Sequence, residues 1–559
     1  MRFLCAVALI VAFVVALPSF CGGVEPRDFR KTPNPFRLLA DQWSDYPTSV
    51  QPYNLQFLRS IDDATARLSL REAVLIGLEN NPGIEVERLE PLRAAEQTLS
   101  EQSIFDPILS FELNKDHTVT PAGISTSTFF QPLQTLDNRN YDFDLKKLLR
   151  TGAELEVSFL NNRLVNSVPN QVLKPSYRPH IEFTLTQPLL RDFGWGLTTL
   201  FVRMAENREG ISLFDYKVQL ARLIQGITEA YWGLAFAHEN LAVQNKGVEW
   251  AESLLHDTEA KVRAGAFARV AVIEARAELA RREEQVLIAQ NEVEVARTRL
   301  RLLINLNPEK TFLPRAIEPD EKPSVEPVPL DRAGSIAKAL RQRPEILSSG
   351  LAIQNQSLQT RYAENQLLPR LDLRAGAGLT GLAGRLKPGT DNPFPGSYWD
   401  ALDRMGSGDF YNYSVGVVLQ IPLANAQAKS KYAQARIELE QARARRRQLA
   451  SQITLEVEQA LNDVQTNFKR IQTTRRAREL AEENLRGQQK RFGVGLVTQK
   501  DVIDFESRLL EAQGAELRAI TDYNNSITAL RLAEGTLLDH YNIKVQGPGK
   551  EPLPWWATF

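Results

Sequence analysis

Residues 491–504 read Arg-Phe-Gly-Val-Gly-Leu-Val-Thr-Gln-Lys-Asp-Val-Ile-Asp, and an echo of their start, Lys-Val-Arg-Ala-Gly, occupies positions 261–265 in the first half of the chain. Two prolines also recur at one constant offset: Pro82 with Pro344, and Pro107 with Pro369. Between the two copies, residues 307–329 are rich in Pro and Glu and predict an extended connector. Similarity at fixed offsets predicts that the chain is a tandem duplication.

Each copy is predicted to contain one very long helix. These helices run roughly from Leu197 to Ala264 and from Ala424 to Arg491, and each would reach about 100 Å. Their apolar residues recur at spacings of four and three, which is typical of a coiled-coil seam. Two shorter segments in each copy would form a second, broken rod beside the long one: 82–104 with 267–306, and 344–368 with 497–541. The pattern favours a wall of antiparallel helices, with the connector across its outside, over a compact enzyme core.

Segments between the helices alternate apolar and polar residues with a period of two, and the four clearest are 109–113, 181–185, 371–379 and 411–421. One apolar and one polar face fit a sheet that separates lipid from water. The alternative is a soluble sheet on a core, but the rods offer no such core. Known barrels begin at about eight strands, so four strands must be shared between copies of the chain. Three copies of four strands would give a twelve-stranded pore.

The first copy has room for an additional hairpin. The stretch between Pro107 and Pro188 is clearly longer than its counterpart between Pro369 and Pro422. Alternating apolar residues within the excess predict two further strands: Tyr141, Phe143 and Leu145, then Leu155, Val157 and Phe159. The sequence leaves open whether this hairpin joins the barrel or stands outside it.

The N-terminus resembles an export signal. Met1-Arg2 precedes an unbroken apolar run from Phe3 to Leu17, and this run falls short of the ~20 residues that a transmembrane helix needs. Residues 1–23 are therefore predicted to be a signal peptide. Cys21 could be acylated as a lipid anchor, although Phe20 stands where a small residue is expected before such a cysteine. The alternative is a cysteine that is removed or has no role.

Composition excludes several classes of protein. The 559 residues include 67 Lys and Arg against 68 Asp and Glu, and a net charge of −1 argues against nucleic acid as a partner. Five scattered histidines and two cysteines outside any CxxC pair argue against a zinc site. Because the sequence contains no recognisable catalytic triad or phosphate-binding glycine loop, we expect no enzyme activity and no cofactor.

From about Leu68 to Tyr541 the chain resembles the outer-membrane efflux proteins, the TolC-like channels. The most specific stretch is 491–504, which is similar to the tip motif of that family, and the Gln-Pro-Leu-Leu of 187–190 resembles the family's passage from strand to helix. The resemblance implies a mainly α fold with a β part. In it a trimeric outer-membrane β-barrel continues as a periplasmic α-helical barrel, in the outer membrane of a Gram-negative-type bacterium.

The resemblance also implies a function, the outer-membrane channel of a tripartite efflux or type I secretion system. Such a channel is a passive exit duct for small molecules or proteins. Its partners would be two further copies of the chain, outer-membrane lipid, a periplasmic adaptor (membrane fusion protein) and an inner-membrane pump of the RND, ABC or MFS type. The alternative is a periplasmic coiled-coil adaptor or scaffold, which would not need lipid-facing strands, and a secreted enzyme is a remote third. Neither the cargo nor the pump class follows from the sequence.

The tip of the rods holds the candidate site residues. Gly265 and Gly495 lie where one rod reverses into the next, and Thr498 can cap the returning helix. Asp501 and Asp504 are three residues apart and share a helix face, so a trimer would gather six carboxylates into a pore gate that attracts cations. Crowding would raise some of their pKa values. The alternative is a helix cap on a solvated acidic face.

The resemblance assigns the tip turn and adaptor docking to five residues: Lys261, Gly265, Arg491, Gly495 and Thr498. The first-copy equivalent of Asp501 is Ala271, and Phe492 lacks the hydroxyl that a tyrosine would offer. We therefore expect packing, rather than polar latches, to hold the tip shut.

The chain is accordingly divided into six segments. They are the signal peptide 1–23, an extended segment 24–67, the first repeat 68–306 with strands at about 105–190, the connector 307–329, the second repeat 330–541 with strands at about 369–421, and a tail 542–559.

Overall fold

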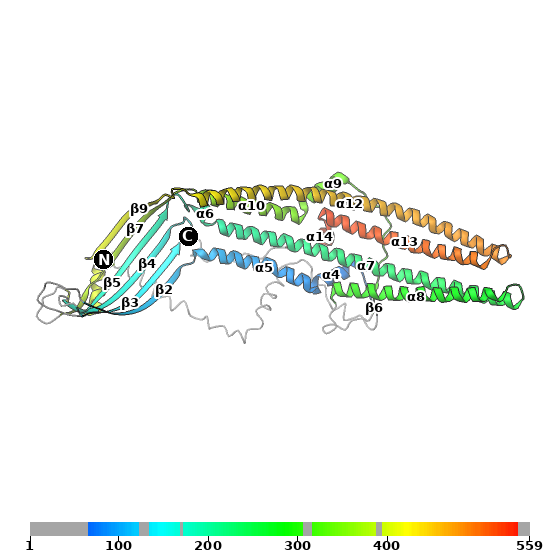
Figure 1. Ribbon diagram of the computed structural model, residues 1–559, viewed down its shortest axis with the longest axis horizontal. Coiled ribbons are helices and arrows are strands. Elements are labelled where there is room, and N and C mark those ends of the chain that lie inside the picture. Colours follow the sequence, from blue (N-terminus) through cyan, green and yellow to red (C-terminus); the bar gives the residue numbers. More distant parts are fainter. Residues whose placement is uncertain (1–64, 122–132, 168–171, 306–315, 387–393, 546–559) are drawn as a thin grey trace.

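The computed structural model describes residues 65–121, 133–167, 172–305, 316–386 and 394–545. The predicted signal peptide, Cys21, nearly all of the segment 24–67 and most of the tail 542–559 lie outside the described residues. The described chain is elongated, with a β-sheet at one end and a bundle of long helices filling the rest of its length (Figure 1). None of the described helices is both long enough and apolar enough to cross a membrane.

The two long helices are present as predicted. Helix α7 spans Leu200–Arg263 with 64 residues, and α12 spans Ala426–Gly493 with 68 residues, so each is about 100 Å long. The shorter helices of the first copy are α4 (Leu70–Asn80), α5 (Pro82–Gln102), the single turns η1 (Ser103–Phe105) and α6 (Trp195–Thr198), and α8 (Arg269–Ile304). Those of the second copy are α9 (Arg332–Gln342), α10 (Pro344–Asn365), α11 (Tyr398–Ser407), α13 (Gln499–Glu534) and α14 (Leu537–His540).

The broken rods also form as predicted, and in the first copy polar caps join the two pieces. Asn81 caps α5 through its side-chain oxygen, and Pro82 occupies the first turn, where its missing N–H costs nothing. The Asn81 side chain donates at 2.8 Å to the Leu303 carbonyl at the end of α8, and Asn305 donates at 2.8 Å to the Asn80 carbonyl. Helices α5 and α8 thus follow one another alongside α7 (Figure 1).

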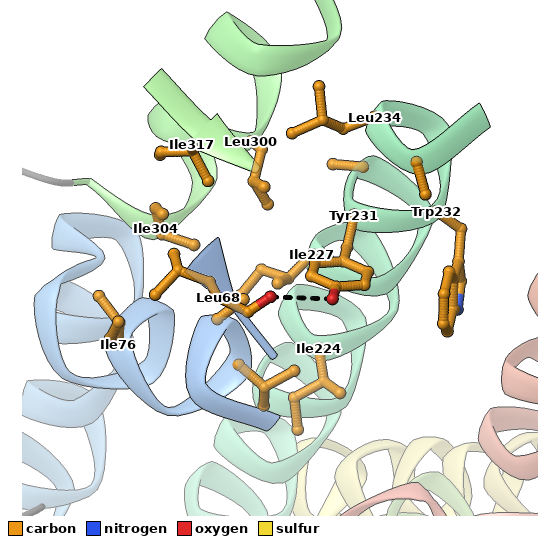
Figure 2. Packing of buried hydrophobic residues seen from close by; sticks show 14 of the residues in the cluster. Leu68, Ile76, Ile224, Ile227, Tyr231, Trp232, Leu234, Leu300, Ile304 and Ile317 are labelled. Carbon is orange, nitrogen blue, oxygen red and sulfur yellow. Dashed lines mark hydrogen bonds between the residues drawn. The ribbon is translucent and has the colours of Figure 1, made fainter. Parts of the chain in front are cut away.

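The hydrophobic core lies where the connector crosses the helices. Strand β1 (Thr65–Leu68) pairs in parallel with β6 (Ala316–Pro319), and a cluster of buried residues from α4, α7 and α8 packs against them (Figure 2). The buried Tyr231 hydroxyl donates to the Leu68 carbonyl at 2.9 Å and accepts from the Glu321 N–H at 3.1 Å. In the second copy, the Tyr523 hydroxyl donates to the Glu326 carbonyl at 2.6 Å. One buried tyrosine from each copy therefore holds the connector against the helices.

The sheet contains the predicted strands in one antiparallel array. The strands are β2 (Ile108–Pro121), β3 (Leu133–Leu148), β4 (Glu154–Asn166), β5 (Leu173–Pro188), β7 (Arg370–Thr380), β8 (Ala383–Leu386) and β9 (Tyr411–Gln420). Their order is β2-β3-β4-β5-β7-β9, and β8 pairs with β5 beyond the end of β7. Cross-strand partners keep the apolar face continuous, as in the row Phe111, Phe143, Phe159, Ile181, Leu379, Tyr411.

The additional hairpin, whose place the sequence left open, joins the sheet, so one chain has more than the four clearest strands. The hairpin formed by β3 and β4 lies inside the sheet, between β2 and β5, so the chain offers six strand positions. The physical reason is that its period-two pattern continues the apolar face of its neighbours: the rings of Phe111 and Phe143 have centroids 4.5 Å apart. Among the residues that the structure describes, the sheet of one chain is open, with β2 and β9 as its edges.

Candidate functional site

Two tight turns close the helical rods at the end of the molecule opposite the sheet (Figure 1). Gly265 between α7 and α8 has φ +75°, and Gly495 between α12 and α13 has φ +80°. In each turn the glycine N–H bonds to the carbonyl three residues back, and the next N–H bonds to the carbonyl five residues back. This is the Schellman helix ending, which needs a left-handed residue. A Cβ at either position would touch nothing within 4 Å, so the backbone angle is what requires glycine.

A capping box begins α13 and fixes two of the predicted residues. The Thr498 hydroxyl accepts from the Asp501 N–H at 3.3 Å, and the Asp501 carboxylate accepts from the Thr498 N–H at 2.8 Å. At the equivalent start of α8, Ala268 is the N-cap and Ala271 stands in place of Asp501, so no side chain caps that helix. The two turns are otherwise equivalent, but the N-terminus of α13 is stabilised by a capping box and that of α8 is not.

The predicted gate carboxylates have different environments within one chain. Hydrogen bonds from the side chain and backbone of Thr498 lower the pKa of Asp501 below its usual value. The predicted rise in pKa depended on crowding of carboxylates between the subunits of a trimer, and a single chain brings no such crowding to Asp501. Asp504 is exposed and lies close enough to Arg281 to help raise the pKa of that guanidinium. Both carboxylates are on α13, just beyond the turn.

A lysine and two aromatic rings connect the two turns. The Lys261 Nζ lies 3.7 Å from the centroid of the Phe492 ring and 5.2 Å from that of Phe267, and the two rings are 6.0 Å apart. Phe492 is 8% exposed and belongs to a small apolar cluster at the tip with Leu254, Leu485, Val502 and Leu509. Lys261 of the first repeat thus contacts the turn of the second repeat in the same chain. Arg491, which is the equivalent of Lys261 in the second repeat, is exposed. Packing across the two turns was predicted, but the cation–π contact was not.

Sequence analysis also missed a charge cluster between α8 and α13 that is buried except for Arg281. Glu278 forms ion pairs of 2.7 Å with both Arg281 and Arg282, and Arg282 donates to the Ser507 hydroxyl at 2.6 Å. Glu506 is buried beside them, with 6% of its surface exposed. The only sequence signal was the spacing of Glu278 and Arg282, which places them on one face of α8.

Glu506 is the carboxyl group of this cluster whose pKa is shifted. Burial is the main cause that raises its pKa to about 7, and the charge of Glu278 adds to the rise, while Arg282 and a hydrogen bond with Gln489 oppose it. A carboxyl group with this pKa changes its charge near neutral pH. Glu506 lies where the first and second repeats of the chain are in contact.

The sequence matches one protein family. The profile described as "Outer membrane efflux protein" matches residues 181–306 and 335–536, which is more than half of the chain. No curated protein sequence matches the chain.

Several solved structures share the fold. The outer-membrane channel OprN has a TM-score of 0.61 at 19% identity, and the match covers 83% of this chain and 89% of OprN. The CmeC outer-membrane channel of Campylobacter jejuni has a TM-score of 0.59 at 17% identity, with coverages of 84% and 86%. The MtrE outer-membrane channel of Neisseria gonorrhoeae, solved in its open state, has a TM-score of 0.57 at 17% identity, with coverages of 84% and 89%. These matches confirm the expected fold.

Proposed function

The chain belongs to the outer membrane efflux protein family, and from this membership we propose that it is the exit duct of a tripartite efflux or type I secretion system. It is an outer-membrane channel protein of a Gram-negative-type bacterium, and its relatives are channels rather than enzymes. In the proposed assembly three copies surround one pore. A periplasmic adaptor contacts the tip, and an inner-membrane pump of the RND, ABC or MFS type supplies the energy.

The observation that carries this proposal is the combination of two surfaces on one chain. One end carries a sheet with an exposed apolar face, on which Tyr413 is 77% exposed and Leu113 is 61% exposed. The other end carries two matched turns at the tips of rods about 100 Å long. A periplasmic adaptor or scaffold would need the rods but not the apolar sheet. A duct needs both, because it must cross lipid and also reach toward the inner membrane.

The tip is the proposed gate and docking site. Asp501 and Asp504 would form the cation-attracting ring in the trimer. Lys261, Gly265, Arg491, Gly495 and Thr498 would form the turns that the adaptor contacts. Opening would be a small rotation of the α12–α13 pair, favoured by differential contacts with the adaptor.

Single-channel recording in planar lipid bilayers tests this proposal. The double substitution Asp501→Asn with Asp504→Asn removes both charges and keeps the side-chain size. We expect a several-fold fall in the ratio of cation to anion permeability. The matched control replaces Asp320 and Glu326, two exposed acids of the connector, and should leave selectivity unchanged. Equal ion selectivity in the unmodified protein, the gate variant and the connector variant would contradict the gate assignment. If the unmodified protein formed no pore, the proposal of an exit duct would be refuted.

A further inference from the structure

Both edge strands of the sheet are unpaired, and both are suited to pair with another molecule of the same protein. Within the described residues, β2 pairs only with β3, and β9 pairs only with β7. Every residue of β2 is exposed, and β9 is exposed at all positions but one. Lipid offers no hydrogen bonds to an open edge, so a sheet in a membrane must close.

Strand direction decides how closure can occur. Strand β2 follows α5 and runs away from the helices, whereas β9 precedes α12 and runs back toward them (Figure 1). Placed side by side in a head-to-tail ring, β2 of one copy and β9 of the next are therefore antiparallel, as outer-membrane barrels require. An even number of strand positions per chain gives this result, and the structure has six.

The β3–β4 hairpin contacts its neighbouring strands on both faces of the sheet. On the apolar face its rings continue the row from Phe111, and on the polar face its side chains bond between strands. The Ser158 hydroxyl donates to Asp144 at 2.5 Å, Lys146 pairs with Glu156 at 3.0 Å, and the Asn162 amide donates to Asn140 at 2.8 Å. A hairpin outside the barrel would have no reason to carry one apolar and one polar face in register with β2 and β5.

We propose that three copies of the chain close one barrel of eighteen strands, six from each copy, in which β2 of each copy pairs with β9 of the next. This inference rests on the trimer of the proposed function, and its strand number differs from the twelve that the four clearest strands of the sequence would give. Barrel diameter grows roughly in proportion to strand number, so the pore in the membrane would be about 1.5 times as wide as one of twelve strands. Barrels of 16–18 strands leave a water-filled channel.

Disulfide trapping in the full-length protein in outer membranes tests the proposal. One set of variants joins neighbouring copies: Ser110→Cys, Glu112→Cys or Asn114→Cys in β2 is combined with Asn412→Cys, Ser414→Cys or Gly416→Cys in β9. A second set lies within one chain, on register partners: Ser110→Cys with Asp144→Cys, and Ser158→Cys with Glu182→Cys. All of these positions are on the polar face, so the lipid face stays intact. Directly opposed residues are close enough for a disulfide.

The expected result is oxidative linkage of subunits into trimers by at least one β2–β9 pair, together with both intrachain disulfides. The matched control, Ser110→Cys with Ser158→Cys, spans an intervening strand and should not link. Linkage of Ser110→Cys to Glu182→Cys would show that β2 abuts β5 with the hairpin excluded, and would overturn the eighteen-stranded barrel while leaving the duct standing. Intrachain disulfides in a protein that migrates only as a monomer would refute the trimer itself. If substitution prevents assembly, a density map of the unmodified protein in lipid counts the strands, and twelve would overturn the proposal.

Discussion

The ammonium group of Lys261 lies 3.7 Å from the ring centroid of Phe492, so a residue of the first copy's turn contacts the turn of the second. Because Lys261 is only partly buried, its cation–π interaction is worth about 0.5–1 kcal/mol. A contact of this strength can be broken and re-formed without unfolding the tip.

Replacing Lys261 with Gln removes the cation but keeps much of the side chain. We expect the closed tip to be weakened, so the fraction of time spent open in single-channel recordings should rise about two- to fivefold for each of these contacts that opening breaks. Lys246→Gln, at an exposed position on the same helix, is the control and should behave like the unmodified protein. An unchanged open fraction in Lys261→Gln would show that this contact does not hold the tip.

Gly495→Ala should destabilise the tip, since an alanine there must adopt φ near +80°. The cost is roughly 1–2 kcal/mol, and it is due to the backbone because no neighbour lies within 4 Å of the added Cβ. Gly493→Ala is the matched control, because Gly493 lies within α12 and also has open space around it. That change should be neutral or stabilising. Hydrogen exchange at the start of α13 measures both, and equal effects would contradict the role given to the left-handed turn.

Thr498→Ala should fray the first turn of α13 by removing the cap. Loss of a threonine cap costs about 0.5–2 kcal/mol, and Thr498→Ser should restore most of it because serine keeps the hydroxyl. The readout is again exchange of the first amides of α13. Restoration by Ser separates the cap from a general effect of substitution, and fraying in both variants would argue against the capping box.

The pH dependence of the tip follows from Glu506. Its pKa in the folded protein, about 7, is higher than its usual 4.5, so the folded state holds the proton more tightly than the unfolded state. The stability that protonation gives is complete below pH 4.5 and is lost as the pH rises through 7. We therefore expect amides of α8 and α13 near Glu506 to exchange more readily at pH 8 than at pH 6, after correction for intrinsic rates.

Glu506→Gln should abolish this difference between pH 6 and pH 8, since the amide side chain does not titrate. Glu511→Gln, one helical turn and a half along α13, is a control that should keep the dependence. If Glu506→Gln retained the full pH effect, another group would be responsible.

Much of the fold could be predicted from the sequence because it depends on repeated patterns. The long helices follow from seams such as Leu220, Ile224 and Ile227, and the turns follow from glycines that recur at equivalent places in the two copies. The place of the β3–β4 hairpin could not be predicted, because alternation in Tyr141–Leu145 fixes which face is apolar but not which strands are neighbours. Glu506 escaped notice for a related reason. The residues that surround it include Glu278 and Arg282, which belong to the other copy of the repeat.

The central claim is that one chain is a third of a duct and cannot close its own sheet. Native mass spectrometry of the full-length protein released from lipid nanodiscs measures the number of copies in each particle directly. The account predicts a particle of three chains that needs lipid or detergent to stay in solution. A single chain that stays soluble in water without either would contradict it.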